Sequence, residues 1–313
     1  MRFLVLARRR LVEAVLTLLG ASVLIWALMP LAPGDPARMI LVAQGVPEPT
    51  PEQISALDRS LHLDRPVFVQ YAHWLWGVMR GDFGLSFVSG RPVADEFVVR
   101  LPATVTLASV SLVLALVLSV ALGVVAALYP RRWPDHGTRW TALLFASVPG
   151  FVVALLLIQV VVVGMGFGKA ALDGTLRQVW LPAICVAVGL ADTWSRLLRA
   201  NLLAFLESPT AAVLRARGAT RLRILWRHGL PNSAVPSLHA LAVGMAVLIG
   251  GATVIETVFT WPGLGAYVVE SVKTRDLPVI QAFTVFATSS YVCTSVVADL
   301  LSAVIDRRIA VDT

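Results

Sequence analysis

Residues 101–128 read LPATVTLASVSLVLALVLSVALGVVAAL, a stretch without a single charged side chain. At about 1.5 Å of rise per residue, a helix over this stretch would be about 42 Å long, which exceeds the roughly 30 Å of hydrocarbon in a bilayer. Backbone N–H and C=O groups cannot stay unpaired in lipid, so such a run must be helical. The stretch therefore predicts a membrane-spanning helix.

Five further apolar runs are long enough to cross a bilayer, and they cover residues 11–31, 140–163, 180–205, 233–256 and 279–305. The chain is 57% hydrophobic and only 14% charged, whereas a soluble domain usually carries about 25% charged residues. None of the runs alternates apolar and polar residues as the strands of a membrane barrel do. The expected fold is an all-α integral membrane protein with about six transmembrane helices.

The net charge of +7 raises the question of a nucleic-acid partner. The arginines cluster at the ends of the apolar runs, where the positive-inside rule places them, and no soluble segment interleaves basic and aromatic residues. We therefore expect a lipid bilayer and no nucleic acid as partner. The first apolar run is longer than the 7–15 residues of a signal-peptide core, which favours a retained first span over a cleaved signal.

Charge asymmetry orients the chain. With the N-terminus in the cytoplasm, sixteen arginines fall on the inside, and four basic residues fall in short outside loops. The inside set is Arg2, Arg8, Arg9, Arg10, Arg131, Arg132, Arg139, Arg196, Arg199, Arg215, Arg217, Arg221, Arg223, Arg227, Arg307 and Arg308; the outside set is Lys169, Arg177, Lys273 and Arg275. This predicts cytoplasmic termini, with a first span over 1–31, an extracytoplasmic segment over 32–100, a five-span core over 101–305 and a cytoplasmic tail over 306–313.

The segment 32–100 has helical signals of its own. Thr50 and Pro51 are a plausible N-cap and first position for a helix near 51–62. A second amphipathic stretch over 67–79 carries Tyr71, Trp74 and Trp76, which suits the outer membrane interface and equally suits the packing of a small lid.

The loop 206–228, between the fourth and fifth runs, contains start and stop signals for two short helices. Ser208 and Pro209 read as an N-cap and first helical residue, Gly218 as a stop, and Thr220 as a second N-cap. Anchoring of its arginines by lipid headgroups is one interpretation. A helix–glycine–helix sequence is not needed for anchoring, so we favour a docking element on the cytoplasmic side.

The loop resembles that of the permease subunits of ATP-binding-cassette importers, which docks on an ATPase subunit. Within that class the chain closely resembles the oligopeptide, dipeptide and nickel permease family, and in particular the first of the two permeases in such systems. The matching strings are PGDPA (33–37), PEQI (51–54), LDRP (63–66), VQY (69–71), RGDFGLS (80–86), GRPV (90–93), RLPAT (100–104), RARG (215–218), HGLPN (228–232), ETVF (256–259), WPGLG (261–265) and DRR (306–308).

The resemblance implies the type I importer permease architecture in a bacterial cytoplasmic membrane. It also implies four partners: a second permease subunit, two ATPase subunits and an extracytoplasmic substrate-binding protein. The ATPase-coupling residues it points to are Ala212, Val213, Leu214, Arg215, Ala216, Arg217, Gly218, Ala219 and Thr220. The glutamate–alanine–alanine triplet of the wider class is replaced here by Ala212, Val213 and Leu214, so only Gly218 matches that motif.

The chain lacks a nucleotide site of its own. A phosphate loop requires the pattern Gly-x-x-x-x-Gly-Lys-Ser/Thr, and the nearest run has Val163 in place of the first glycine and Ala170 in place of the hydroxyl residue. We therefore expect no cofactor and no metal in this chain, with ATP and Mg²⁺ bound by partner subunits.

Polar residues inside the runs cost about 2.5–3.5 kcal/mol each at a helix centre, so they need an explanation. Asp192 and Arg196 are four residues apart and can pair on one helix face, and Asp299 can lie near Arg307. The functional interpretation is that Asp192, Arg196, Glu256, Trp261 and Asp299 line a translocation path or gate, with Glu256 beside the WPGLG string at the outer end.

The favoured function is that of a non-catalytic permease subunit that translocates di- or oligopeptides, or a related small solute. Two alternatives stay open. A secondary carrier would work without ATPase partners. A membrane-embedded enzyme would need a converging nucleophile and base, for which Ser195 or Ser289 with His239 is the one candidate.

Overall fold

The computed structural model describes residues 2–31, 35–43, 45–60, 65–166 and 173–305, which are helical apart from loops and one isolated β-bridge. Several predicted features fall outside these residues. They are positions 33–34 and 63–64 of the family strings, positions 167–170 of the run compared with a phosphate loop, and the tail 306–313.

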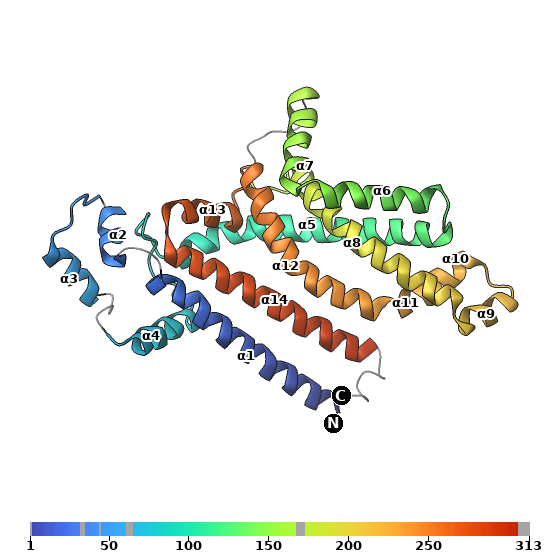
Figure 1. Ribbon diagram of the computed structural model, residues 1–313, viewed down its shortest axis with the longest axis horizontal. Helices are drawn as coiled ribbons and strands as arrows, with labels where there is room; N and C mark the ends of the chain where they lie inside the picture. The colour runs from blue at the N-terminus through green and yellow to red at the C-terminus, as the bar shows by residue number, and fades with distance from the viewer. Residues whose placement is uncertain (1, 32–34, 44, 61–64, 167–172, 306–313) are drawn as a thin grey trace.

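Five long helices form the bundle and confirm five of the six predicted spans. They are α1 (Arg2–Leu31), α5 (Val93–Leu128), α8 (Trp180–Glu207), α12 (Ala234–Val258) and α14 (Leu277–Ile305). The helix α5 packs along α8, and α12 packs between α8 and α14. Figure 1 shows α1 at the edge of the bundle, running alongside α14.

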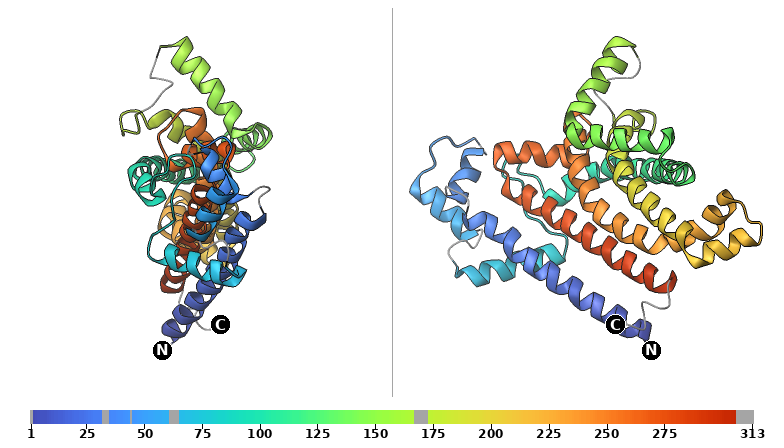
Figure 2. Two further views of the ribbon diagram at one scale, coloured as in Figure 1. Left: turned by 90° about the vertical axis from the view of Figure 1, so that its left-hand side faces the viewer. Right: turned by 45° about the vertical axis from the view of Figure 1, so that its right-hand side comes forward.

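The sixth predicted span, over 140–163, is not one helix. The chain forms α6 (Trp133–Ser147), breaks, and continues as α7 (Gly150–Leu157) and the π-helical segment η1 (Ile158–Gly164). Pro149, at φ −56° and ψ 138°, explains the break, because proline has no N–H and disfavours helical geometry in the residue before it. After the break α7 points away from the bundle, as both Figure 1 and Figure 2 show.

The short helices gather at the two ends of the bundle (Figure 1). One end has α2 (Pro36–Ala43), α3 (Pro51–Ser60), α4 (Val67–Met79) and α13 (Leu264–Thr274). The other end has α9 (Pro209–Ala216), α10 (Arg221–Ile224), the π-helical η2 (Leu225–Gly229) and α11 (Leu230–Asn232). The start of α1 and the end of α14 lie toward this second end.

The predicted start of α3 is confirmed in detail. The Gln53 N–H donates to Thr50 Oγ1 at 3.3 Å, and the Thr50 N–H donates to Gln53 Oε1 at 2.9 Å. This reciprocal pair is a capping box, which satisfies two backbone donors at the helix start. The helix α4 likewise covers the predicted 67–79 stretch.

The contact between α5 and α8 depends on small residues. Ser111, Ala115, Ser119 and Gly123 recur every fourth residue of α5 and are buried. A Cβ at Gly123 would lie 3.1 Å from the backbone oxygen of Ser195 on α8, so a side chain there would force the two helices slightly apart. Close approach through small residues is the usual way that membrane helices associate.

We predict that Gly123→Val lowers the stability of the folded chain by about 1–3 kcal/mol, because the added methyl groups overpack this contact. The measurement is the unfolding midpoint of the purified protein in mild detergent. Gly189→Ala on α8 is the matched control, since a Cβ there meets nothing within 4 Å. Equal midpoints for the two variants would contradict this account of the α5–α8 contact.

Candidate functional site

The helix α9 begins and ends as its sequence predicts. Ser208 Oγ accepts a hydrogen bond from the Ala211 N–H at 3.3 Å, and Pro209 is the first helical residue. At the other end, the Gly218 N–H donates to the Arg215 carbonyl at 2.9 Å, and the Ala219 N–H donates to the Leu214 carbonyl at 3.1 Å. With Gly218 at φ +83°, this is a Schellman motif, whose left-handed position favours glycine.

The chain then re-enters the bundle through α10 and η2. Thr220 Oγ1 caps α10 by accepting from the Arg223 N–H at 3.4 Å. Ala211, Ile224 and Leu225 are buried in one apolar cluster with Leu202 and Leu206 of α8. The loop therefore packs against α8 and α5 through a shared buried cluster.

Two arginines secure the loop to helix ends. Arg215 Nη1 donates to the Leu206 carbonyl near the end of α8, and Arg221 Nη2 donates to the Ala127 carbonyl near the end of α5, both at 2.9 Å. The last carbonyls of a helix have no partner within it and attract positive charge. Arg215 belongs to the predicted coupling residues and makes this internal contact; Arg221 lies outside the predicted set.

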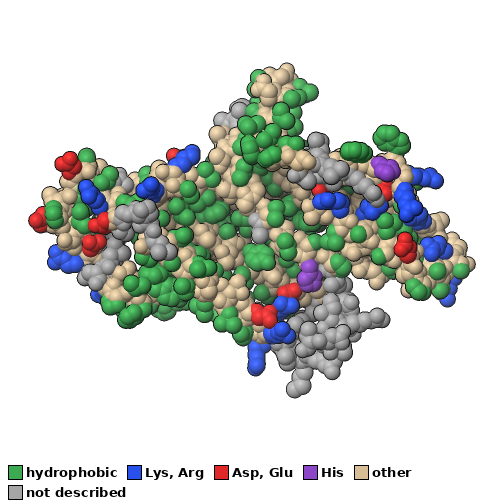
Figure 3. Space-filling model, viewed as in Figure 1, with side chains coloured by type: hydrophobic (Ala, Val, Ile, Leu, Met, Phe, Trp, Pro, Cys, Tyr) green, Lys and Arg blue, Asp and Glu red, His purple; other side chains and the backbone are tan. Residues whose placement is uncertain are grey.

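The outward surface of the loop is apolar with a basic border. Val213, Leu222 and Trp226 are exposed to 52%, 50% and 55%. Ala212, Ala216, Arg217 and Gly218 are exposed beside them. Figure 3 shows basic side chains, which are arginines at this end, gathered around the loop. Large exposed apolar side chains that share one loop with arginines are typical of a protein-docking surface.

The predicted pairing of Asp192 with Arg196 is confirmed, with Arg196 Nη2 lying 3.1 Å from Asp192 Oδ2. The predicted partner of Asp299, Arg307, lies outside the described residues. Asp299 instead lies 3.3 Å from Arg10 Nε of α1 and 3.2 Å from His239 Nε2 of α12. A carboxylate on α14 thus joins three helices, which sequence spacing could not indicate because the partners are distant along the chain.

Glu256 is completely buried at the end of α12 and connects three helices. Its Oε1 accepts from Thr104 Oγ1 of α5 at 2.8 Å, and its Oε2 accepts from the Ala266 N–H of α13 at 3.1 Å. Thr104 Oγ1 in turn accepts from the Leu264 N–H at 2.7 Å. The carboxylate therefore satisfies donors at the start of α13, where the helix dipole also favours negative charge.

The string WPGLG, residues 261–265, folds around this carboxylate. Trp261 is completely buried, and its Nε1 donates to the Ala103 carbonyl of α5 at 2.9 Å. A Cβ at Gly263 would lie 2.4 Å from the Glu256 carboxylate, so only glycine fits there. Glu256 and this string do come together, as predicted, although the buried carboxylate does not line an open path in this structure.

A second polar junction, which sequence analysis missed, holds the segment 84–93. Ser86 Oγ donates to Asp276 Oδ2 at 2.5 Å, and the Phe87 N–H donates to Asp276 Oδ1 at 3.0 Å. Asp276 directly precedes α14, and both it and Ser86 are 2% exposed. Nearby, burial raises the pKa of the Tyr267 phenol, and the Asp276 and Glu96 carboxylates raise it further. The junction attaches part of the RGDFGLS string to the core.

Two of the three residues considered for a membrane enzyme, Ser195 and His239, have other partners. Ser195 Oγ donates to the Asp192 carbonyl of its own helix at 2.9 Å, and His239 is paired with Asp299. Within the ranges that the structure covers, no three His, Cys, Asp or Glu side chains gather as a metal site would require.

Comparisons with known proteins give the family. Residues 119–311 match the family described as "Binding-protein-dependent transport system inner membrane component", and residues 1–108 match its N-terminal region. The chain is 35% identical over 301 residues to the glutathione transport system permease protein GsiC of Escherichia coli, covering 96% of this chain and 97% of the relative. The proteins of the same name from Shigella dysenteriae and Shigella flexneri show the same identity and coverage.

The type I importer permease architecture that the sequence predicted agrees with this family and with the five long apolar helices. Members of this family are non-catalytic transport subunits that cross the membrane several times. The chain belongs to the family of binding-protein-dependent transport system inner membrane components, and it is the permease subunit of an ATP-binding-cassette importer for peptides or related solutes in the bacterial cytoplasmic membrane.

Proposed function

We propose that this chain forms one half of a heterodimeric membrane core that passes short peptides, glutathione among them, into the cell. A second permease supplies the other half, and an extracytoplasmic binding protein delivers the solute. Two ATPase subunits bind ATP and Mg²⁺, and one of them docks on the α9–Gly218–α10 loop. The permeases named for glutathione transport, at 35% identity, support this class of solute.

One observation carries the docking proposal. The loop is fixed to α5 and α8 by its buried cluster and two arginine caps, yet it exposes Val213, Leu222 and Trp226 outward. An element that packs firmly on α5 and α8 and exposes apolar side chains can bind an ATPase subunit. It can then transmit the movement of that subunit to the two helices. Two packings of the bundle, each favoured by a different nucleotide state, would then open the path alternately to either side.

The proposed orientation places both termini and this loop in the cytoplasm. It follows from the arginine bias, and the structure adds that the loop, the start of α1 and the end of α14 lie toward the same end of the bundle. We propose that Asp192, Arg196 and Asp299, which form ion pairs in the structure, line the translocation path. Glu256 and Trp261 form a proposed outer gate.

Purification of the tagged chain from its own membranes tests this function. In mild detergent, mass spectrometry should find a second permease and two ATPases, and added peptide with its binding protein should stimulate ATP hydrolysis. A cysteine at position 220 should react with an impermeant thiol reagent only in inside-out vesicles. Solute uptake without any ATPase would favour a secondary carrier, and labelling from outside the cell would contradict the docking role.

A further inference from the structure

A cavity of about 380 Å³ lies at the end of the bundle opposite the α9–α10 loop. It is partly open, and it is lined by α1, α2, α3, the inner face of α4, the segment 82–87 and the start of α14. Its walls are mostly apolar, and they include Trp26, Met29, Leu57, Val69, Phe83 and Phe87. Small-molecule sites usually have volumes of about 300–1,000 Å³ and this kind of lining, so the cavity is large enough for part of an organic ligand.

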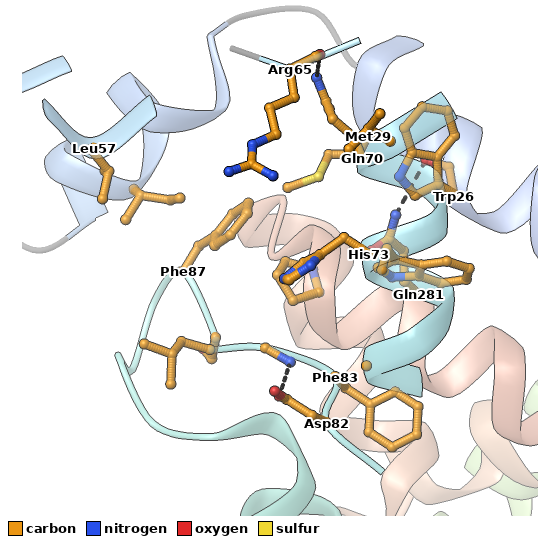
Figure 4. Close-up of a pocket in the computed structure, with 18 residues that line it drawn as sticks. Trp26, Met29, Leu57, Arg65, Gln70, His73, Asp82, Phe83, Phe87 and Gln281 are labelled. Carbon is orange, nitrogen blue, oxygen red and sulfur yellow. Dashed lines mark hydrogen bonds between the residues drawn. The ribbon is translucent and has the colours of Figure 1, made fainter. Parts of the chain in front are cut away.

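The polar groups of the cavity differ in how they are used. Figure 4 shows the Arg65 guanidinium extending into the cavity between Leu57 and Met29. The Gln70 side chain donates to the Arg65 carbonyl at 2.8 Å, which holds the backbone of Arg65 at the start of α4. Asp82, at the other end of the view, accepts from the Gly84 N–H at 2.9 Å. A cation thus faces an apolar chamber, while the carboxylate is turned to its own backbone.

Two features of the surrounding helices indicate that the cavity lies near the level of a membrane surface. Trp26 and Met29 belong to the last turns of the candidate span Ala7–Pro30. The far face of α4 exposes Phe68, Trp76 and Met79 to 73%, 53% and 64%, and the Arg80 guanidinium lies 4.4 Å from the Trp76 ring centre. Exposed aromatic residues beside a basic one are typical of a helix lying in the headgroup region.

The floor of the cavity joins the first and last spans. Gln281 of α14 is 3% exposed, and its Nε2 donates to the Ile25 and Trp26 carbonyls of α1 at 3.2 and 3.4 Å. A molecule in the cavity would therefore contact both α1 and α14 at the one place where this amide links them, and its binding should stabilise that junction.

We propose that the cavity binds one anionic phospholipid, with its phosphate on Arg65 and the first part of one acyl chain against the apolar walls. A guanidinium forms strong, charge-assisted hydrogen bonds with phosphate oxygens. Lipids of the bilayer surface are always present at this depth. A soluble ligand would have to compete with them for the cavity. The lipid site is separate from the proposed transport function. It rests on that proposal only for the orientation of the chain, which decides whether the lipid comes from the outer or the inner leaflet.

The test counts lipids retained by the purified transporter complex. After exchange into mild detergent containing equal amounts of phosphatidylglycerol and phosphatidylcholine, native mass spectrometry should find one phosphatidylglycerol held per chain. Arg65→Glu should weaken that retention by about tenfold or more, since one charge-assisted hydrogen bond is worth at least that factor. Arg59→Glu on α3 is the matched control, because the Arg59 guanidinium bonds to the Ser55 carbonyl of its own helix.

A second variant tests the contribution of the apolar walls separately from that of the Arg65 charge. Val69→Trp on α4, a helix with no buried residue, should fill the cavity and reduce retention of both lipids without unfolding the protein. Added phosphatidylglycerol should raise the unfolding midpoint of the natural protein but not of the Arg65→Glu variant. Equal retention by the Arg65→Glu and Arg59→Glu proteins would overturn the proposal, and so would displacement of the lipid by a short apolar peptide with a free carboxylate.

Discussion

Gly218→Pro will separate ATP hydrolysis from uptake while the permease still inserts and assembles. Gly218 has φ +83°, and its N–H donates to the Arg215 carbonyl; proline fixes φ near −65° and has no N–H. The turn between α9 and α10 must therefore reorganise. Solute transported per ATP hydrolysed in proteoliposomes should fall by about tenfold or more. A loss of about 1.4 kcal/mol in the free energy of docking already gives that factor.

Gly218→Asn is the matched control, because asparagine tolerates the left-handed conformation better than other residues with a side chain. A Cβ at this position meets nothing within 4 Å, so backbone geometry and not crowding is what the comparison tests. This variant should keep most of its coupling. Arg217→Glu should lose coupling by reversing a charge on the exposed surface, without altering the backbone. Normal transport by both the proline and glutamate variants would contradict the docking role.

The sequence could predict this loop because its signals are local. A cap such as Ser208 or Thr220 acts on backbone groups within three residues, and a glycine stop acts within its own turn. The same reasoning explains why five spans were predicted well, since a long apolar run has one stable form in lipid. The run 140–163 looked equally good by composition, but one proline at its centre divided it.

Tertiary partners, in contrast, could not be read from spacing. Asp192 and Arg196 share a helix face and were paired correctly, whereas Asp299 finds Arg10 and His239 from two other helices. Asp276 and Ser86 are 190 positions apart, so no local pattern links them. The small residues along α5 also gave no sign of their partner, because their spacing alone does not say which helix covers them.

Glu256 illustrates the same limit and leads to a sharper expectation. Sequence position suggested a gate residue, because a carboxylate near the end of a span beside a glycine-rich string is unusual. The structure shows a completely buried joint that receives donors from α5 and α13. The gate and the joint make different demands: a gate needs the negative charge, whereas a joint needs acceptors of the right shape.

Glu256→Ala should therefore destabilise the protein by about 3 kcal/mol or more, since it leaves the Thr104 hydroxyl and the Ala266 N–H without their acceptor in a buried site. Gly263→Ala should be similarly harmful, because its Cβ would lie 2.4 Å from the carboxylate. The measurement is the unfolding midpoint in detergent, together with the amount of intact complex. Two controls should change little: Gly251→Ala on the same helix, where a Cβ meets nothing within 4 Å, and Glu270→Ala, whose pair with Lys273 is exposed.

Glu256→Gln then decides between joint and gate. The amide keeps the size of the carboxylate and one acceptor oxygen, which can serve the Ala266 N–H. Its NH₂ group then faces the Thr104 hydroxyl, which loses the acceptor that it has in the natural protein. If Glu256 acts only as a joint, this variant should lower the unfolding midpoint less than Glu256→Ala does, and the folded protein should keep nearly natural uptake. If its charge serves a gate, uptake by the folded protein should fall as well. A stable Glu256→Ala protein would contradict the joint, because no buried donor would then depend on that side chain.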